Sequence, residues 1–350
     1  MDDKDYWRSE RVAFLALCQL KGVGYWTLYK WSAANISFKD VLRDPAKFGV
    51  DKAVAAAANN ADNPVDLIWR QGLALARRLA SMSVVLIFKG EPEFPQRLRE
   101  IADGPSWIFV QGAVDNLYGA IVGIVGAREP SLDGIFLARV VVAALHGIKL
   151  STVSGLALGI DQVAHVESLN CKIPTIAVLG TGILENYPKN SIKLRQSILD
   201  SGGTIVTEYL PSQSHSAENF VRRNRIQAAL SDVLIPVEWK VKSGTAHTVR
   251  YAKAYGKRVM GVLLPYHDPA TPEAIFIEQD CGGMMFTLPR QSETMFNIIS
   301  ALSDSDASID IGAVARADEE REQSVSVEEG KSQGVDDESL SSESGQLPLI

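Results

Sequence analysis

The chain has 350 residues, of which 46% are hydrophobic and 22% are charged. These values are typical of a globular protein that is long enough for more than one domain. No apolar run reaches the ~18 residues that a membrane span requires, and the acidic start of the sequence does not resemble a secretory signal. Three widely spaced cysteines and five scattered histidines predict neither a disulfide framework nor a metal site. We therefore expect a cytoplasmic protein without membrane association.

The net charge of −7 is distributed unevenly. Residues 303–350 contain 13 acidic and three basic residues, so this segment carries −10 and leaves residues 1–302 at about +3. The segment is rich in Ser, Glu, Asp and Gly and has no aromatic residue, so it can bury too little apolar area to offset its chain entropy. We expect a mildly basic folded body followed by a disordered acidic tail at residues 303–350.

Residues 1–82 predict a small helical domain. Apolar residues recur at helical spacing over residues 7–20, 25–33 and 65–81. The Gly-Val-Gly segment at residues 22–24 separates the first two helices, as in a helix-hairpin-helix (SAM-like) domain, whose glycine turn exposes N–H groups that can hold a DNA phosphate. An ordinary connection between two helices explains the same glycines.

The periodicity changes at about residue 83, where short β-branched runs begin to alternate with helical stretches. This alternation predicts a doubly wound, mostly parallel Rossmann-like α/β sheet over residues 83–302. The expected strands are residues 84–88, 107–111, 120–125, 150–154, 175–179, 204–207, 233–237 and 258–263. The expected helices are residues 132–146, 159–169, 191–199, 222–230, 245–255 and 294–302.

A cationic cluster marks the expected start of one of these helices. The sequence Asn-Phe-Val-Arg-Arg-Asn-Arg at residues 219–225 runs directly into an apolar-periodic segment. Exposed N–H groups and the helix dipole favour an anion at a helix start, and guanidinium groups are suited to phosphate. Arg222, Arg223, Asn224 and Arg225 are therefore predicted to bind a phosphate-bearing molecule.

Glycine and small polar residues follow several expected strands, where ligands of doubly wound sheets bind. Glycine at these junctions can also serve close packing of a helix on a strand. No P-loop pattern is present, and the Gly-x-Gly at residues 180–182 lacks the third glycine of a dinucleotide fingerprint, so no cofactor is predicted. The junction residues expected at an anion-binding groove are Gly126, Arg128, Ser154, Gly155, Gly159, Lys189, Lys242, Ser243, Gly244 and Thr245.

Acidic residues offer little support for catalysis. Asp161 and His165 lie four residues apart on one expected helix face, where the acid complements the helix dipole and the histidine is its neighbour. Glu208 and Glu238 each lie near the end of a strand and are the only acids placed to face a ligand. We expect no catalytic residue.

Several junction segments together resemble the DprA/Smf family of DNA-processing proteins, closely over residues 120–263. The segment at residues 154–161, Ser-Gly-Leu-Ala-Leu-Gly-Ile-Asp, looks like the family's Ser-Gly-x-Ala-Arg-Gly-Ile-Asp. Tyr-Pro-Lys-Asn at 187–190, Glu-Tyr-Leu-Pro at 208–211, Phe-Val-Arg-Arg-Asn-Arg-Ile at 220–226 and Lys-Ser-Gly-Thr-Ala-His-Thr-Val at 242–249 are similar to further family segments. The helical N-terminus also fits the family.

The resemblance implies a non-enzymatic protein that binds single-stranded DNA and passes it to a RecA-type recombinase, usually as a homodimer. It implies DNA contacts at Arg128 and Lys242 and at the three arginines of residues 222–225. Three positions depart from the family pattern: Leu158 replaces an arginine, Val221 replaces a proline, and His247 replaces a small apolar residue. No C-terminal winged-helix domain is recognisable.

The tail ends in Gln-Leu-Pro-Leu-Ile. Gln346, Leu347, Leu349 and Ile350 resemble the peptide by which bacterial replication and repair proteins bind the DNA sliding clamp. A flexible tether would raise the local concentration of such an anchor. Chance explains so short a match as well, and Ile350 stands where Phe is usual.

Two other classes of function compete with DNA binding. LOG-type enzymes are related Rossmann proteins that bind a nucleotide and cleave its N-glycosidic bond, but their Pro-Gly-Gly-x-Gly-Thr-x-x-Glu signature is absent here. A nucleotide sensor that uses the same groove stays open, because Leu158 removes a cation from it. A scaffold that acts mainly through its tail is a third alternative.

Overall fold

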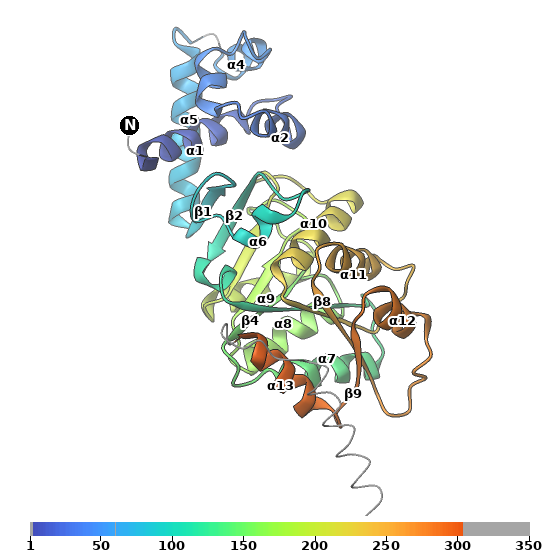
Figure 1. The fold of residues 1–350 in the computed structure, drawn as a ribbon. Coiled ribbons are helices and arrows are strands. Elements are labelled where there is room, and N and C mark those ends of the chain that lie inside the picture. The colour runs from blue at the N-terminus through green and yellow to red at the C-terminus, as the bar shows by residue number, and fades with distance from the viewer. Residues whose placement is uncertain (1–2, 60, 304–350) are drawn as a thin grey trace, which may run out of the picture.

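The computed structural model of the protein describes residues 3–59 and 61–303 (Figure 1). They form a helical region at one end of the molecule and an α/β body built on one sheet. Most of the expected acidic tail, including the terminal peptide at residues 346–350, lies outside the described residues, so the tail and clamp hypotheses stay predictions. In the described part of the chain, no helix is long and apolar enough to cross a membrane.

Five helices make up the part of the N-terminal region that the structure describes. Local signals fix the start of the longest of them, because Asn63 accepts a hydrogen bond from the Asp66 N–H and Pro64 occupies the first turn. The first and last helices pack closely at Gly72, where a Cβ would collide with the backbone of Val12 and with Ala16. The helices are α1 (Asp3–Leu17), α2 (Tyr25–Ala33), α3 (Phe38–Arg43), α4 (Asp51–Ala57) and α5 (Pro64–Ser81).

Within the described residues, nine strands form the sheet, in the order β1-β2-β6-β5-β4-β3-β7-β8-β9. The β1–β2 and β2–β6 pairs are antiparallel and all other pairs are parallel, which confirms the predicted mostly parallel sheet. Eight strands match the predicted segments, whereas the edge strand β9 was not predicted. The strands are β1 (Val84–Phe88), β2 (Trp107–Gly112), β3 (Ala120–Gly126), β4 (Leu150–Ser154), β5 (Thr175–Val178), β6 (Thr204–Thr207), β7 (Val233–Val237), β8 (Arg258–Leu263) and β9 (Met284–Thr287).

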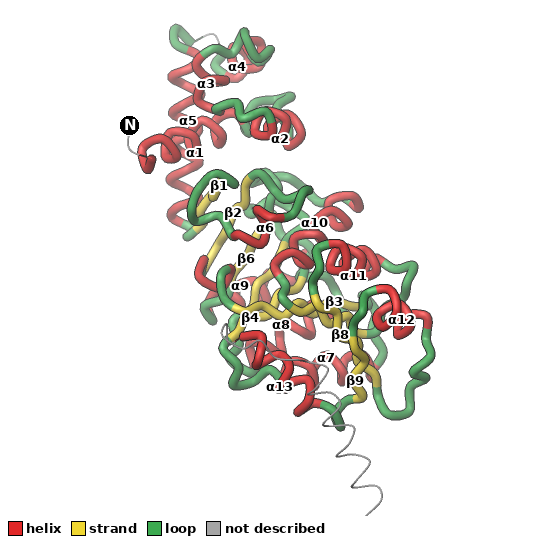
Figure 2. Tube along the Cα trace, viewed as in Figure 1, coloured by secondary structure: helices red, strands yellow, loops and turns green. Residues whose placement is uncertain are grey.

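Helices cover both faces of the sheet (Figure 2). One face carries α7 (Leu132–Ala144), α8 (Ile160–Asn170), α9 (Ile192–Asp200) and α13 (Ser292–Ser303). The other carries α6 (Gln96–Glu100), α10 (Ala217–Leu230) and α11 (Gly244–Ala254). Short elements complete the body: η1 (Val114–Leu117), η2 (Lys189–Ser191), α12 (Pro272–Ile275) and η3 (Phe276–Asp280).

The helical region and the sheet share one apolar core. Phe14 of α1 packs against Trp107 and Phe109 of β2, with ring centroids 4.8 and 6.2 Å apart. Arg11 of α1 donates to the Leu86 carbonyl at 2.8 Å and forms an ion pair with the buried Glu91. The helices therefore pack directly on the antiparallel edge of the sheet, while the domain boundary at residues 82–83 stays a prediction.

Candidate functional site

A groove of about 700 Å³ lies at the carboxyl ends of β3 and β7. The chain continues from β3 through β4 and β5 to β6 on one side and returns with β7 and β8 on the other, so the strand order reverses beside β3. Ligands of open α/β sheets bind at such a reversal. The groove is lined by Val125, Gly126, Ala127, Arg128, Ala157, Asp161, Tyr187, His215, Ala217, Phe220, Val221, Arg223, Asn224, Gln227, Glu238, Trp239, Lys240, Ser243, Gly244, Thr245 and Thr248.

Half of the predicted site residues line this groove. They are Gly126, Arg128, Arg223, Asn224, Ser243, Gly244 and Thr245. The other predicted residues do not line it: Ser154, Gly155, Gly159, Lys189, Arg222, Arg225 and Lys242. Lys189 and Lys242 are exposed, whereas Ser154 is buried and donates to the Ile124 carbonyl at 2.6 Å.

Two junction glycines have packing roles. Gly155 lies against the guanidinium of Arg223, which a Cβ at this position would strike. Gly159 has a φ of 83° and lies against the backbone of Ala127 and Arg128, so it needs both the left-handed conformation and the missing side chain. These glycines shape the floor of the groove by letting neighbouring groups approach.

The sequence predicted that the arginine cluster lies at a helix start, and this prediction was wrong. Helix α10 begins at Ala217, where the Ser216 side chain accepts a hydrogen bond from the Asn219 N–H. The three arginines therefore occupy its second and third turns, beyond the unpaired N–H groups of the first turn. The predicted start at residue 222 was wrong because the apolar periodicity begins later than the helix, whose first turn is polar and capped by serine.

Arg225 points into the protein rather than toward the groove. Its side chain is 2% exposed, and two of its nitrogens each lie 2.8 Å from an oxygen of Glu208. Its Nε donates to the Asp103 carbonyl at 2.8 Å. Glu208, which follows β6, also accepts from the Tyr25 hydroxyl at 2.5 Å. Burial and the nearby Glu208 raise the pKa of Tyr25, so this phenol stays protonated as a donor.

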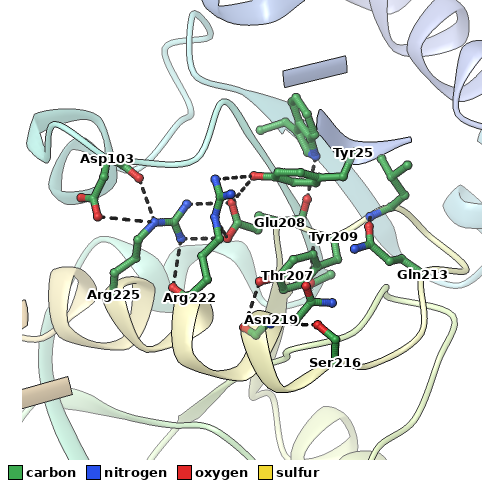
Figure 3. A network of polar contacts seen from close by, with 12 residues as sticks. Tyr25, Asp103, Thr207, Glu208, Tyr209, Gln213, Ser216, Asn219, Arg222 and Arg225 are labelled. Carbon is green, nitrogen blue, oxygen red and sulfur yellow. Dashed lines mark hydrogen bonds and ion pairs between the residues drawn. The ribbon is translucent and has the colours of Figure 1, made fainter. Parts of the chain in front are cut away.

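Arg222 points toward the N-terminal helices (Figure 3). Its guanidinium carbon lies 4.2 Å from the ring centroid of Trp26 and 4.9 Å from that of Tyr25. It also donates to the Tyr25 hydroxyl at 3.1 Å and lies 3.6 Å from Glu208. Arg222 and Arg225 thus share one carboxylate and fasten α10 to β6 and α2.

Arg223 is the one arginine of the three that borders the groove. It is 3% exposed and donates to the carbonyls of Gly155 and Val178. Its buried Nε has no hydrogen-bond partner among the described residues. Burial lowers the pKa of Arg223, while Asp161 opposes this shift. Asp161 in turn accepts from the Gly155 N–H at 3.1 Å. The pair forms a polar floor beneath the groove.

Exposed cations lie at the rim of the groove and beside it. Arg128 is exposed at the end of β3, with its guanidinium carbon 5.9 Å from the ring centroid of Phe220. Within residues 3–59 and 61–303, no carboxylate forms an ion pair with Arg128 or Lys242. Lys240 lies 3.8 Å from Glu273 but keeps a largely exposed side chain. The rim can therefore accept an anion without breaking an existing pair.

Three aromatic rings come together in the lining of the groove, beside Arg128. The ring of Tyr187 stacks on that of His215 at 4.1 Å and lies 5.0 Å from Phe220. Tyr187 and Phe220 belong to the sequence motifs described above, whereas His215 was not predicted. No local signal identifies His215, because it lies in a loop and reaches the other rings only through the fold.

The buried histidine and the acidic residues near the groove have structural partners. His165 is fully buried and contacts the Thr175 hydroxyl at 2.8 Å, and burial lowers its pKa to about 3. Glu238 accepts from the Ser131 N–H at 2.9 Å and so holds the start of α7. Glu208 accepts hydrogen bonds from Arg225 and Tyr25. In the described part of the chain, no three His, Cys, Asp or Glu side chains gather as a metal site would require.

The fold and groove define a Rossmann-type α/β protein with a cationic and aromatic groove at the point where the strand order reverses. A family model for DNA recombination-mediator protein A matches residues 85–278. Because this match spans more than half of the chain, the protein belongs to that family, as the DprA/Smf resemblance indicated.

Relatives support the same assignment. The chain is 32% identical over 198 residues to Protein Smf of Escherichia coli K12, which covers 57% of this chain and 53% of that protein. The structure of DNA processing protein A from Streptococcus pneumoniae aligns at a TM-score of 0.54 and 29% identity, over 67% of this chain and 83% of that one. DNA processing protein A from Helicobacter pylori is described as having a unique single-stranded DNA binding mode. Its structure aligns at a TM-score of 0.52 and 25% identity, over 62% of this chain and 97% of that one. The chain thus spans about half the length of the first relative.

Proposed function

We propose that the protein binds single-stranded DNA in the groove between β3 and β7. The observation that carries the proposal is the position of Arg128, which is exposed and has no ion-pair partner among the described residues, over the ring of Phe220. The Phe220 ring contacts the stacked rings of Tyr187 and His215. A cation beside stacked aromatic rings suits a phosphate and its unpaired bases at once. The Helicobacter pylori relative, which is described as binding single-stranded DNA, supports this assignment.

The start of α11 completes the phosphate site in this proposal. No side chain caps this helix, which begins at Gly244 beside the groove. Its first N–H groups and its dipole favour a phosphate there. Asn224 donates to the Gly244 carbonyl at 3.2 Å and positions this turn. Lys189 and Lys242, which are exposed outside the groove, would contact the strand on either side.

Arg222, Arg223 and Arg225 act differently in this proposal from what the sequence suggested. Arg223 adds positive potential from the floor, because it borders the groove while its donors are turned to backbone carbonyls. Arg222 and Arg225 position α10 through Glu208. A non-enzymatic role fits the acidic residues, since Asp161 and Glu238 are held by backbone N–H groups.

The family assignment extends the proposal to partners. We infer that the protein delivers the bound strand to a RecA-type recombinase, as the description of the family as recombination mediators implies. We propose further that it does so as a homodimer. Gly22 and Gly24 are exposed, whereas Val23 between them is buried, and a helix-hairpin-helix contact with DNA stays part of the proposal. So does sliding-clamp binding by residues 346–350.

Titration with fluorescent single- and double-stranded oligonucleotides at two salt concentrations tests the DNA proposal. We expect preferential binding of the single strand, with an affinity that falls steeply as salt rises. Arg128→Ala should weaken binding across sequences and reduce the salt slope by about 1. Arg139→Ala removes an exposed arginine from α7 on the opposite face and serves as the control. A flat salt response, or release of free base from nucleoside monophosphates, would reject the proposal in favour of a nucleotide sensor or a LOG-like enzyme respectively.

A further inference from the structure

A second cavity, of about 610 Å³, lies between the N-terminal helices and α10. Asn219 and Arg222 line this cavity, whereas Phe220 and Arg223 line the groove, so the two hollows flank the same helix. Figure 3 shows Arg222, Asn219 and Gln213 on the side of α10 that faces Tyr25. The cavity is lined by Cys18, Gln19, Gly24, Tyr25, Trp26, Leu75, Tyr209, Leu210, Pro211, Ser212, Gln213, Glu218, Asn219 and Arg222.

Trp26 is the unusual feature of this cavity. Its side chain is 52% exposed although it belongs to a well-packed aromatic cluster with Tyr25 and Tyr29. The guanidinium of Arg222 lies over its ring at 4.2 Å and is itself fixed by the Tyr25 hydroxyl. The indole is therefore held in one orientation on the cavity wall. A fixed and accessible ring loses little entropy when a planar ligand stacks on it.

The charge of the cavity decides which planar ligand suits it. Arg222, its only lining cation among the described residues, lies 3.6 Å from Glu208, and the lining Glu218 is exposed. No spare positive charge is left for a phosphate. The remaining polar groups are neutral, chiefly the amides of Asn219 and Gln213 and the hydroxyl of Ser212. Amides and hydroxyls are the groups that hydrogen-bond to the edges of an unpaired base.

We propose that this cavity binds an unpaired nucleobase by stacking on Trp26, and that the base belongs to the strand held in the groove. The inference rests on the proposed function. A helix with its side chains is about 10 Å across, so a strand leaving the groove over the exposed start of α10 has only this helix to cross. The groove would then hold phosphates and bases, and the cavity a further base.

Oligonucleotides of about 4 and about 16 nucleotides, which bracket the usual site sizes, test the proposal with the full chain. Trp26→Ala should weaken binding of the long strand about tenfold, as expected for one stacked base, and leave the short strand unchanged. Trp26→Phe should retain most of the affinity. Tyr266→Ala removes another exposed aromatic side chain, which lines neither the groove nor the cavity, and is the control. Thermal unfolding should show that the Trp26 variants keep their fold.

Three outcomes would overturn the inference. Equal weakening of both strand lengths places Trp26 in the groove site, and unchanged affinity of both removes it from DNA binding. A Trp26-dependent affinity for a mononucleotide, with unchanged strand binding, assigns the cavity to a free nucleotide instead. In all three cases Arg128→Ala still weakens both strands if the proposed function holds. If the wild type binds neither strand, the proposed function fails and the inference fails with it.

Discussion

Arg225 and Glu208 form a two-pronged ion pair in the interior, with both nitrogen–oxygen distances at 2.8 Å and both side chains at most 2% exposed. The pair joins α10 to the end of β6, and the Tyr25 hydroxyl adds α2 to the same carboxylate. The side chains of the three arginines at residues 222–225 therefore point in three different directions from α10. Arg225 points into the core, Arg222 points toward α2, and Arg223 points toward the floor of the groove.

Removal of one partner of this pair should destabilise the protein strongly. Arg225→Ala leaves Glu208 buried without its main counterion, and we expect a loss of about 3–5 kcal/mol in the free energy of unfolding. The matched double variant Arg225→Met with Glu208→Leu removes both charges and should lose much less. Denaturant unfolding measures both. A loss below about 1 kcal/mol for the single variant would contradict the structural role of the pair.

Gly155 should tolerate no side chain. A Cβ there would strike the guanidinium of Arg223, which is held by two backbone carbonyls and cannot move freely. Gly155→Ala should destabilise the protein by about 1–3 kcal/mol and weaken DNA binding, because the floor of the groove shifts. Gly119→Ala, with no atom within 4 Å of the added carbon, is the matched control and should stay within about 0.5 kcal/mol. Equal stability of the two variants would show that Arg223 is free to move.

His165 should make stability depend on pH. Burial lowers its pKa to about 3 from 6.5. Between pH 6.5 and 3, His165 is therefore protonated in the unfolded chain but neutral in the folded protein. Stability from this group is therefore complete above pH 6.5 and falls as the pH drops toward 3, by about 1.4 kcal/mol per pH unit. Asp161 acts in the opposite direction, since burial raises its pKa despite Arg223.

His165→Asn isolates this contribution. The amide can keep the contact with the Thr175 hydroxyl but does not titrate. The difference in unfolding free energy between wild type and variant should shift in favour of the variant as the pH falls from 6.5 to 4. A constant difference over this interval would show that His165 is not held neutral by the fold.

Phe220 should contribute stacking rather than charge. Phe220→Leu should weaken single-stranded DNA binding by about 1–3 kcal/mol for the lost stack while leaving the salt slope unchanged, because no phosphate contact is removed. Phe220→Tyr keeps the ring and should bind nearly as the wild type does. A changed salt slope for the leucine variant, measured in parallel with Arg128→Ala, would mean that the ring acts by holding Arg128.

The sequence predicts the sheet well and the site only partly. Eight strands were predictable because β-branched runs buried on both faces leave a clear pattern, whereas β9 is a short, half-buried Met-Met-Phe-Thr segment without one. The antiparallel pairing of β1 and β2 was not visible in the periodicity. The roles of Arg222 and Arg225 depend on Tyr25 and Glu208, which lie far away along the chain. The sequence shows that an arginine is present in a helix, but it does not show toward which neighbour the arginine side chain points.

Substitution of Leu158, which stands where the resembled family pattern has an arginine, tests whether the groove lacks a cation at this position. The Leu158 side chain is 47% exposed in the loop after β4, next to Ala157, which lines the groove. Leu158→Arg should raise the affinity for single-stranded DNA and steepen the salt slope by about 1, because one further phosphate contact releases one further counterion. Leu158→Gln is polar but uncharged and should leave the slope unchanged. Equal slopes for the two variants would place residue 158 outside the path of the strand, and the cationic contribution would then rest on Arg128 and its neighbours alone.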